Sequence, residues 1–156
     1  MNAIEFYDVA EHPELKDLIV RWLCESFGAP KNYEFWRSLV AHCRSTDFPM
    51  IYVAFVDGTP TGTVGLSRAD ILSRQDLCPW LVALYVCSEF RCNGIGSALQ
   101  DFAIEKAKDL GYDTLYLLTS LTGYYEKKDW EYMGDETNYD GTIVRIYRKK
   151  TVSKGL

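Results

Sequence analysis

Apolar residues in the first third of the chain recur at the spacing of two amphipathic helices. Residues 2–9 form a short strand-like segment ahead of them. From Pro13 onward, apolar residues return every three or four positions, which predicts a helix that ends at Gly28. A second apolar stripe begins after Asn32, the expected N-cap, and continues to Cys43. Because each helix is apolar on one face, we expect both to cover a sheet.

The middle of the chain predicts the strands of that sheet. The turn residues Asp57 and Gly58 separate residues 50–56 from residues 59–67, and this pattern is typical of an antiparallel hairpin. Residues 80–86 are continuously apolar, which indicates a strand buried on both faces. We therefore place residues 80–86 near the middle of the sheet.

The last third predicts a crossover and a second hairpin. An apolar stripe over residues 96–111 indicates a helix, and residues 113–119 form the next strand. Strand, helix and strand in this order predict a parallel pair. A short helix is expected over residues 121–128, followed by a hairpin over residues 130–149.

Length and composition indicate one folded domain. The 156 residues are 47% hydrophobic and 25% charged, which excludes a disordered or low-complexity chain. Neither a repeat nor a linker interrupts the pattern. We predict a single domain over residues 1–150 and a loose C-terminal tail over residues 151–156.

Charge and cysteine content limit the classes of binding partner and the cellular compartment that we expect. Lys and Arg number 17 against 22 Asp and Glu, a net charge of -5, which argues against nucleic acid or anionic lipid as a partner. No apolar stretch approaches the roughly 18 residues of a membrane span. The five cysteines form no C-x-x-C pair, and the first residues are acidic, so we expect a reduced, cytoplasmic protein. Two histidines without ligand spacing predict no metal site.

The turn after residues 80–86 carries the strongest functional signal. A buried strand leads through Gly94 and Gly96 directly into a helix, so several main-chain N–H groups should converge beside the helix N-terminus. Backbone approaches a phosphate closely only where no Cβ intervenes. The segment therefore predicts an anion cradle.

Two nucleotide-binding motifs fail against this spacing. A dinucleotide fingerprint needs a small residue where the chain has Leu99, and a Walker loop needs Gly-Lys where it has Gly96-Ser97. The remaining pattern, Arg91-x-x-Gly94-x-Gly96, resembles the pyrophosphate motif of the GCN5-related N-acetyltransferase family. The order of elements over residues 2–150 is also similar. The resemblance implies an α/β fold with a mixed, mostly antiparallel sheet, a central parallel strand pair and flanking helices.

The same resemblance implies acetyl-CoA as the cofactor and assigns residues to it. Main-chain groups of the turn and of the first helical residues would hold the pyrophosphate. The strand segment before the turn would hold the pantetheine arm, with Leu84 and Val86 bonding it through main-chain groups. The implied cofactor-binding residues are Leu84, Tyr85, Val86, Arg91, Cys92, Asn93, Gly94, Ile95, Gly96 and Ser97.

The resemblance also implies catalytic residues. Tyr124 and Tyr125 begin a segment similar to the family's tyrosine motif, which makes Tyr125 the candidate general acid for the leaving thiolate and Tyr124 the alternative. Family members often carry a glutamate base where this chain has Trp80. Another carboxylate must then deprotonate the amine. Asp70 is favoured on its place in the polar connection 68–79, and the alternatives are Asp76 and Glu89.

The acceptor implied by the resemblance is an amine that attacks acetyl-CoA directly within a ternary complex. An acidic protein with aromatic residues attracts cations, which favours a primary amine, on a small molecule or on a protein. A non-catalytic acyl-CoA-binding sensor is the alternative function. The sequence carries no signal for an oligomeric state.

Overall fold

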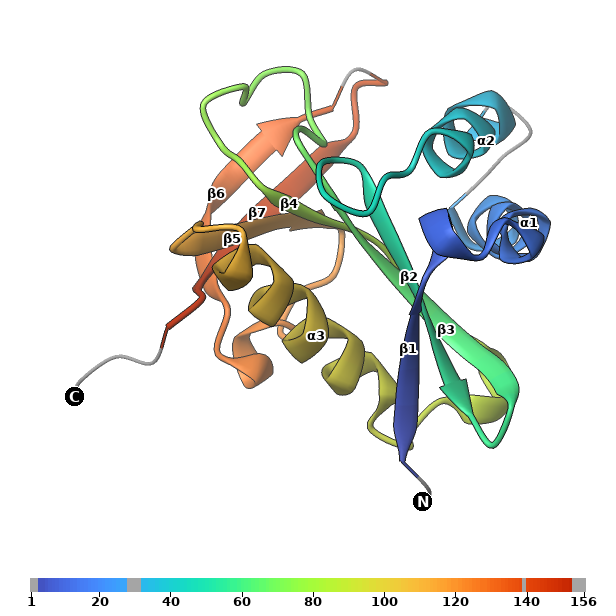
Figure 1. The fold of residues 1–156 in the computed structure, drawn as a ribbon. Coiled ribbons are helices and arrows are strands. Elements are labelled where there is room, and N and C mark those ends of the chain that lie inside the picture. The colour runs from blue at the N-terminus through green and yellow to red at the C-terminus, as the bar shows by residue number, and fades with distance from the viewer. Residues whose placement is uncertain (1–2, 28–31, 139, 153–156) are drawn as a thin grey trace. The chain divides into compact units, whose positions relative to one another are not determined.

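The computed structural model describes residues 3–27, 32–138 and 140–152 (Figure 1). The chain forms two compact units. The first unit comprises Met1–Leu66 and Ala83–Gln100, and the second comprises Ser67–Val82 and Asp101–Leu156. Strand β4 (Trp80–Val86) and helix α3 (Ile95–Asp109) each begin in one unit and end in the other.

The first unit is built on antiparallel strands. These are β1 (Ile4–Asp8), β2 (Met50–Val56) and β3 (Thr59–Ser67), with β1 pairing β2 and β2 pairing β3. The predicted hairpin turn is confirmed. Asp57 and Gly58 have φ of 51° and 77°, and positive φ at both central residues matches the twist of the flanking strands.

Helices α1 (Lys16–Phe27) and α2 (Tyr33–Ala41) belong to this unit. Pro13 begins a separate 3₁₀ turn ahead of α1, and the predicted helix end at Gly28 lies outside the described residues. Asn32 stands at the N-cap position of α2, as predicted, but its side chain makes no cap bond to this helix. Its Nδ2 donates instead to the Phe27 carbonyl at 2.9 Å, which satisfies one of the carbonyls left unpaired at the end of α1.

The second unit continues the sheet with β5 (Thr114–Thr119), β6 (Glu131–Thr137) and β7 (Ile143–Lys150). Strand β7 pairs antiparallel with both β5 and β6. The pairing of Trp80 with Tyr116 is parallel, which confirms the predicted crossover. The strand order is β1-β2-β3-β4-β5-β7-β6. The predicted α/β class with a mostly antiparallel sheet and one parallel pair is confirmed.

The helix predicted over residues 121–128 is reduced to one 3₁₀ turn, Glu126–Lys128. Side-chain acceptors hold the residues ahead of this turn in local turn structure. The N–H of Leu121 donates to Thr119 Oγ1 at 3.0 Å, and that of Gly123 donates to Glu126 Oε1 at 3.2 Å. Such local bonds compete with helix formation.

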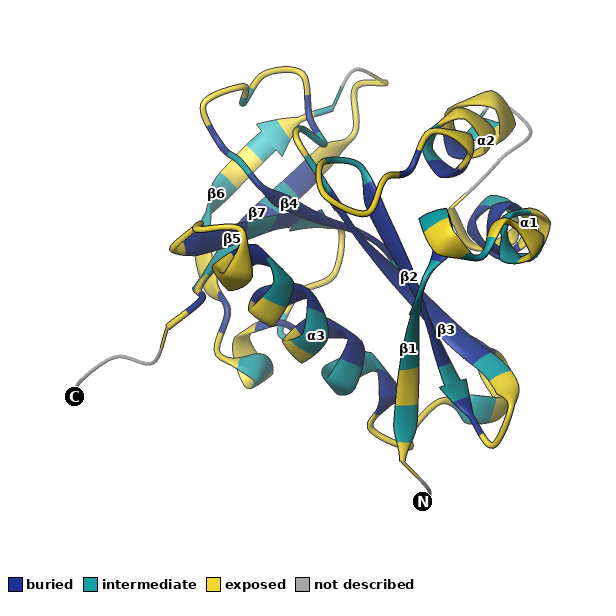
Figure 2. Ribbon diagram, in the orientation of Figure 1, coloured by how far each residue is buried: buried dark blue, intermediate teal, exposed yellow. Residues whose placement is uncertain are grey.

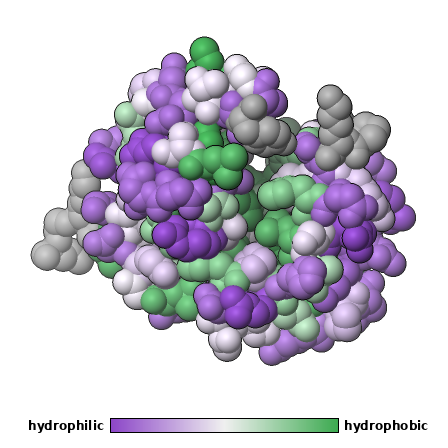
Figure 3. All heavy atoms as spheres, turned by 90° about the horizontal axis from the view of Figure 1, so that it is seen from above, coloured by the Kyte–Doolittle hydropathy of each residue, from purple (hydrophilic) through white to green (hydrophobic). Residues whose placement is uncertain are grey.

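Each unit has its own buried apolar residues (Figure 2). Ile19, Ile51 and Leu99 are fully buried in the first unit, as are Trp80 and Leu115 in the second. Hydrophilic residues are spread over the face shown in Figure 3, with hydrophobic residues scattered between them. No helix within the described ranges is long and apolar enough to cross a membrane.

The expected tail begins with a fixed residue. Thr151 is buried, its N–H donates to the Asp113 carbonyl at 3.0 Å, and its hydroxyl donates to the Tyr112 carbonyl at 2.8 Å. Residues 153–156 lie outside the described part of the chain.

Candidate anion-binding and catalytic site

Strand β4 directs the main-chain groups of Leu84 and Val86 away from β3. The Cys87 N–H donates to the Thr61 carbonyl of β3 at 2.8 Å, and the Tyr85 carbonyl also faces β3 at Gly62. Main-chain groups of alternate residues point to opposite edges of a strand. The polar groups of Leu84 and Val86 therefore lie on the other edge, where a ligand can bond them without displacing β3.

Gly62 lets β3 and β4 approach closely, and sequence reasoning missed it. A Cβ at this position would lie 2.6 Å from the Tyr85 carbonyl oxygen and 3.1 Å from Leu99 Cδ1. The first distance is a collision with backbone, which cannot move aside alone. A glycine inside a strand pattern signals such a close approach, although the partner is not visible in the sequence.

Ala83 interrupts β4 just before the predicted pantetheine segment. Its φ is 57°, a left-handed conformation that costs a non-glycine residue about 1–2 kcal/mol. Strain of this kind clusters at ligand sites, where the surrounding structure holds it in place. The sequence gives no signal for this conformation, because alanine at position 83 simply continues the apolar run of residues 80–86.

The turn before α3 is the segment for which we predicted a cradle of main-chain donors. Cys92 and Gly94 have φ of 64° and 79°, and residues 91–94 are exposed. None of the described residues accepts a hydrogen bond from the N–H of Cys92, Asn93 or Gly94. Helix α3 follows at Ile95, and the N-terminus of a helix carries partial positive charge. Successive outward N–H groups beside such a helix bind anions.

The polar side chains of this turn point back to its own main chain. Arg91 Nε donates to the Val86 carbonyl at 2.9 Å, and the guanidinium carbon lies 5.8 Å from the centre of the Tyr85 ring. Asn93 Nδ2 lies 3.2 Å from the carbonyl oxygens of both Phe90 and Arg91. Arg91 and Asn93 therefore both bond main-chain carbonyls around the turn.

Tyr125 lies in the second unit within an aromatic cluster. Its side chain is only 8% exposed, and its ring centre lies 4.8 Å from that of Tyr124, 6.1 Å from Trp130 and 5.8 Å from Tyr147. Burial raises the pKa of Tyr125 to about 12. Tyr124, the alternative, is 39% exposed, with Lys128 Nζ 5.4 Å from its ring centre.

Glu126 ties this tyrosine turn to β7, a role that the sequence did not reveal. The Tyr147 hydroxyl donates to Glu126 Oε1 at 2.9 Å, and Arg145 Nε donates to the same hydroxyl at 2.9 Å. Tyr147 is fully buried, so these bonds lie at the base of the turn. They fix the backbone next to Tyr125.

Asp70 lies half-buried in the connection between β3 and β4, within the second unit. Burial raises its pKa from the usual range to about 7. The two arginines of the connection are engaged elsewhere: Arg68 donates to the Leu77 and Gln75 carbonyls, and Arg74 pairs with Asp76 and Glu136. None of the ion pairs between described residues involves Asp70. Its desolvation therefore meets no opposing charge.

The other acidic candidates differ from Asp70. Asp76 is exposed, and its hydrogen bonds from Arg74 lower its pKa. Glu89 is exposed on the short turn after β4. Trp80 is fully buried and donates from Nε1 to the Leu77 carbonyl at 2.8 Å, so it anchors the end of the same connection. The cradle residues thus converge in the first unit, while Asp70 and Tyr125 belong to the second.

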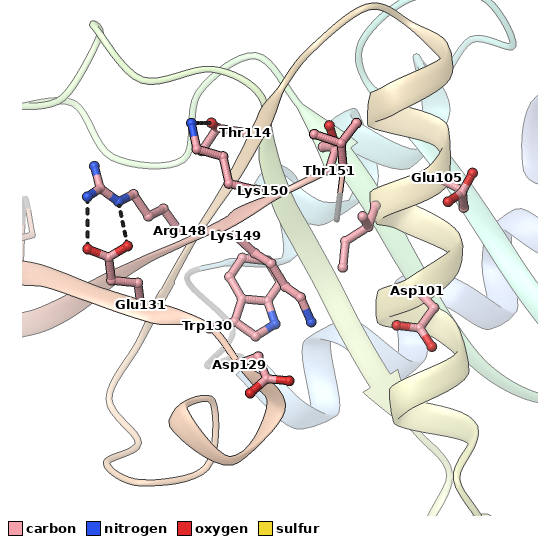
Figure 4. Close-up of a pocket in the computed structure, with 12 residues that line it drawn as sticks. Asp101, Glu105, Thr114, Asp129, Trp130, Glu131, Arg148, Lys149, Lys150 and Thr151 are labelled. Atoms are coloured by element: carbon pink, nitrogen blue, oxygen red, sulfur yellow. Dashed lines mark hydrogen bonds and ion pairs between the residues drawn. The ribbon is translucent and has the colours of Figure 1, made fainter. Parts of the chain in front are cut away.

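A separate groove lies in the second unit and contains none of the predicted site residues. Its volume is about 1140 Å³. Trp130 lies at its centre, with Asp101 and Glu105 of α3 on one side and the Arg148–Glu131 ion pair on the other (Figure 4). Two lysines at the end of β7 have hydrogen-bond partners here. Lys150 Nζ donates to Thr114 Oγ1, and Lys149 Nζ donates to the Lys128 carbonyl.

Comparison with known proteins shows that the chain is similar to acetyltransferases. The profile of the acetyltransferase (GNAT) family matches residues 16–130. No curated protein matches the chain by sequence.

Several solved structures share the fold at low sequence identity. An aminoglycoside 6'-N-acetyltransferase complexed with coenzyme A is 17% identical with a TM-score of 0.73, and each chain is covered to 99%. The aminoglycoside 6'-N-acetyltransferase from Enterococcus faecium is 19% identical with a TM-score of 0.74, again with 99% of each chain covered. Ard1 from Thermoplasma volcanium is 18% identical with a TM-score of 0.73, covering 97% of this chain and 100% of Ard1.

Proposed function

The chain belongs to the acetyltransferase (GNAT) family, whose members use acetyl-CoA, and we propose that it acetylates a primary amine by direct attack within a ternary complex. The observation that carries this proposal is the set of outward main-chain N–H groups at Cys92, Asn93 and Gly94, in the motif where the family holds its pyrophosphate.

The residues present suit coenzyme A. Main-chain groups of residues 91–97 bind the pyrophosphate, because a helix N-terminus and open backbone donors stabilise negative charge. Leu84 and Val86 bond the pantetheine arm along the edge of β4 that faces away from β3, as an added strand would be bonded. Tyr85 separates these two residues and packs its ring 5.5 Å from that of Trp22 on α1, which steadies this part of the strand.

Acetyl-CoA supplies the acetyl group as a thioester. The protein must remove one proton from the attacking ammonium and donate one proton to the sulfur that leaves. We assign removal of the proton from the incoming ammonium to Asp70, whose pKa of about 7 suits a base at neutral pH. We assign the donor to the leaving sulfur to Tyr125. With a pKa of about 12, its hydroxyl remains protonated throughout the physiological range.

The acceptor class follows from charge. An amine with a pKa near 10.4 is a cation before it reacts, and a chain of net charge -5 attracts it. The amine belongs to a small molecule or to a protein. Nucleic acid and membrane lipid, both anionic, are not proposed as partners.

Thiol release tests the function. We expect the chain with acetyl-CoA to liberate free thiol when one class of amine in a panel is added, and the acetylated amine to appear by mass spectrometry in equal amount. The panel should contain polyamines, aminoglycosides, amino acids and peptides with a free N-terminus. Binding of acetyl-CoA with no productive amine in any class would favour an acyl-CoA sensor over an enzyme.

The role of Tyr125 predicts a loss of rate without a loss of cofactor. Tyr125→Phe keeps the buried ring and removes only the hydroxyl, so we expect kcat to fall by about 100-fold. The dissociation constant for acetyl-CoA, measured by calorimetry, should stay within about two- to three-fold of the wild-type value. This corresponds to a change in binding free energy below about 1 kcal/mol. Tyr124→Phe is the matched control. A larger fall in kcat for Tyr124→Phe would transfer the role to that residue.

A further inference from the structure

The side chain of Arg91 bonds the protein's own main chain, although its positive charge could instead face an anionic ligand. Its Nε donates to the Val86 carbonyl at 2.9 Å, across the turn that joins β4 to α3. Within that turn, the N–H of Phe90 donates to the Cys87 carbonyl at 2.9 Å, and Cys87 itself is bonded to Thr61 of β3. The Arg91 side chain therefore closes a ring of bonds that fixes the turn to the end of β4.

This closure determines where the cradle N–H groups point. A peptide unit is planar, so its carbonyl and its N–H face in opposite directions. The Arg91 carbonyl is bonded by Asn93 Nδ2 at 3.2 Å, which directs the following N–H, that of Cys92, away from Asn93. With Arg91 holding one end of this segment and Asn93 the other, the outward donors are ordered before any ligand arrives.

Building on the proposed function, we infer that Arg91 acts as a positioning residue. Its Nε–H bond to the Val86 carbonyl orders the pyrophosphate cradle, and this bond contributes more to cofactor affinity than the positive charge of the guanidinium does. The Val86 carbonyl has a second lone pair, so the bond also leaves the carbonyl able to accept from a ligand.

Three substitutions separate the hydrogen bond from the charge. Arg91→Gln removes the charge and keeps an N–H donor that can reach the Val86 carbonyl. Arg91→Lys keeps the charge and loses the fixed donor near the backbone, because the ammonium lies at the end of a longer flexible chain. Arg91→Leu removes both. Arg44→Gln removes one positive charge elsewhere in the first unit, where Arg44 bonds Asp47 and the Phe48 carbonyl, and is the matched control.

The measurement is the dissociation constant of coenzyme A by calorimetry, at low and at moderate salt, with a thermal melt of each variant. We expect Arg91→Lys and Arg91→Leu to bind about five-fold or more weakly than Arg91→Gln, since one neutral hydrogen bond is worth about this factor. Arg44→Gln should bind as wild type does. Arg91→Lys binding as tightly as Arg91→Gln, or more tightly, would overturn the inference, and so would equal affinities for wild type and the three Arg91 variants. Failure of the wild-type chain to bind coenzyme A would instead refute the proposed function.

Discussion

Gly94→Glu is expected to abolish detectable coenzyme A binding while the chain still folds. Gly94 has φ of 79°, and a Cβ placed there would meet nothing within 4 Å, so the fold has room for a side chain. The left-handed backbone costs a non-glycine residue about 1–2 kcal/mol. The larger effect is on the ligand, because a carboxylate beside the outward N–H groups occupies the position of the pyrophosphate and repels it. We expect an affinity loss of about 100-fold or more.

Ligand-induced stabilisation gives the measurement. Coenzyme A at 100 times its dissociation constant should stabilise the wild-type chain by about 2.7 kcal/mol and raise its Tm. The same concentration should leave the Tm of Gly94→Glu unchanged. Gly111→Glu is a close control, since Gly111 has φ of 94°, also has open space around a Cβ, and lies beyond the other end of α3. It introduces the same strain and charge away from the cradle. A Gly94→Glu chain that folds and binds coenzyme A with wild-type affinity would show that the cradle is not the pyrophosphate site.

The elements that could be predicted from the sequence are those fixed by local chemistry. Strand β4 is continuously apolar. Asp57-Gly58 specifies the hairpin of β2 and β3, and the motif glycines mark the turn into α3. The parallel pairing of β4 with β5 follows from the strand–helix–strand order, because a helical crossover brings the second strand back parallel to the first. These features depend on periodicity and backbone preference, which a sequence displays directly.

The features that were missed depend on which distant residues meet. Asn32 is a good N-cap by type, yet its amide serves Phe27 of the preceding helix because that carbonyl lies within reach. The need for glycine at position 62 arises from the Tyr85 carbonyl of another strand. The side-chain bond of Arg91 depends on the position of the Val86 carbonyl, which the motif does not specify. In each case the residue type indicated a role, but the residue that it contacts could not be identified from the sequence.

Asp70→Asn is expected to lower activity and raise stability together, because the same burial causes both effects. The folded-state pKa of about 7 lies above the usual value near 3.9, so the folded chain holds the Asp70 proton more tightly than the unfolded chain does. The free energy of unfolding should therefore fall as pH rises from about 4 to 7. Asparagine cannot ionise, so at pH 8 the variant should be more stable than wild type by about 1–4 kcal/mol in urea unfolding.

The kinetic half of this prediction has the opposite sign. A base of pKa about 7 is ionised only above that pH, so the wild-type rate should rise with pH through about 7 and then level off. Asp70→Asn should lose about 100-fold or more in kcat at pH 8 and should lack this rise. Asp76→Asn is the control in the same connection, because Asp76 is exposed and paired with Arg74, and it should retain the pH profile. A profile lost in Asp76→Asn and kept in Asp70→Asn would move the base to Asp76. An Asp70→Asn chain that is more stable and fully active would show that the protein tolerates a buried acid for some purpose other than deprotonating the amine.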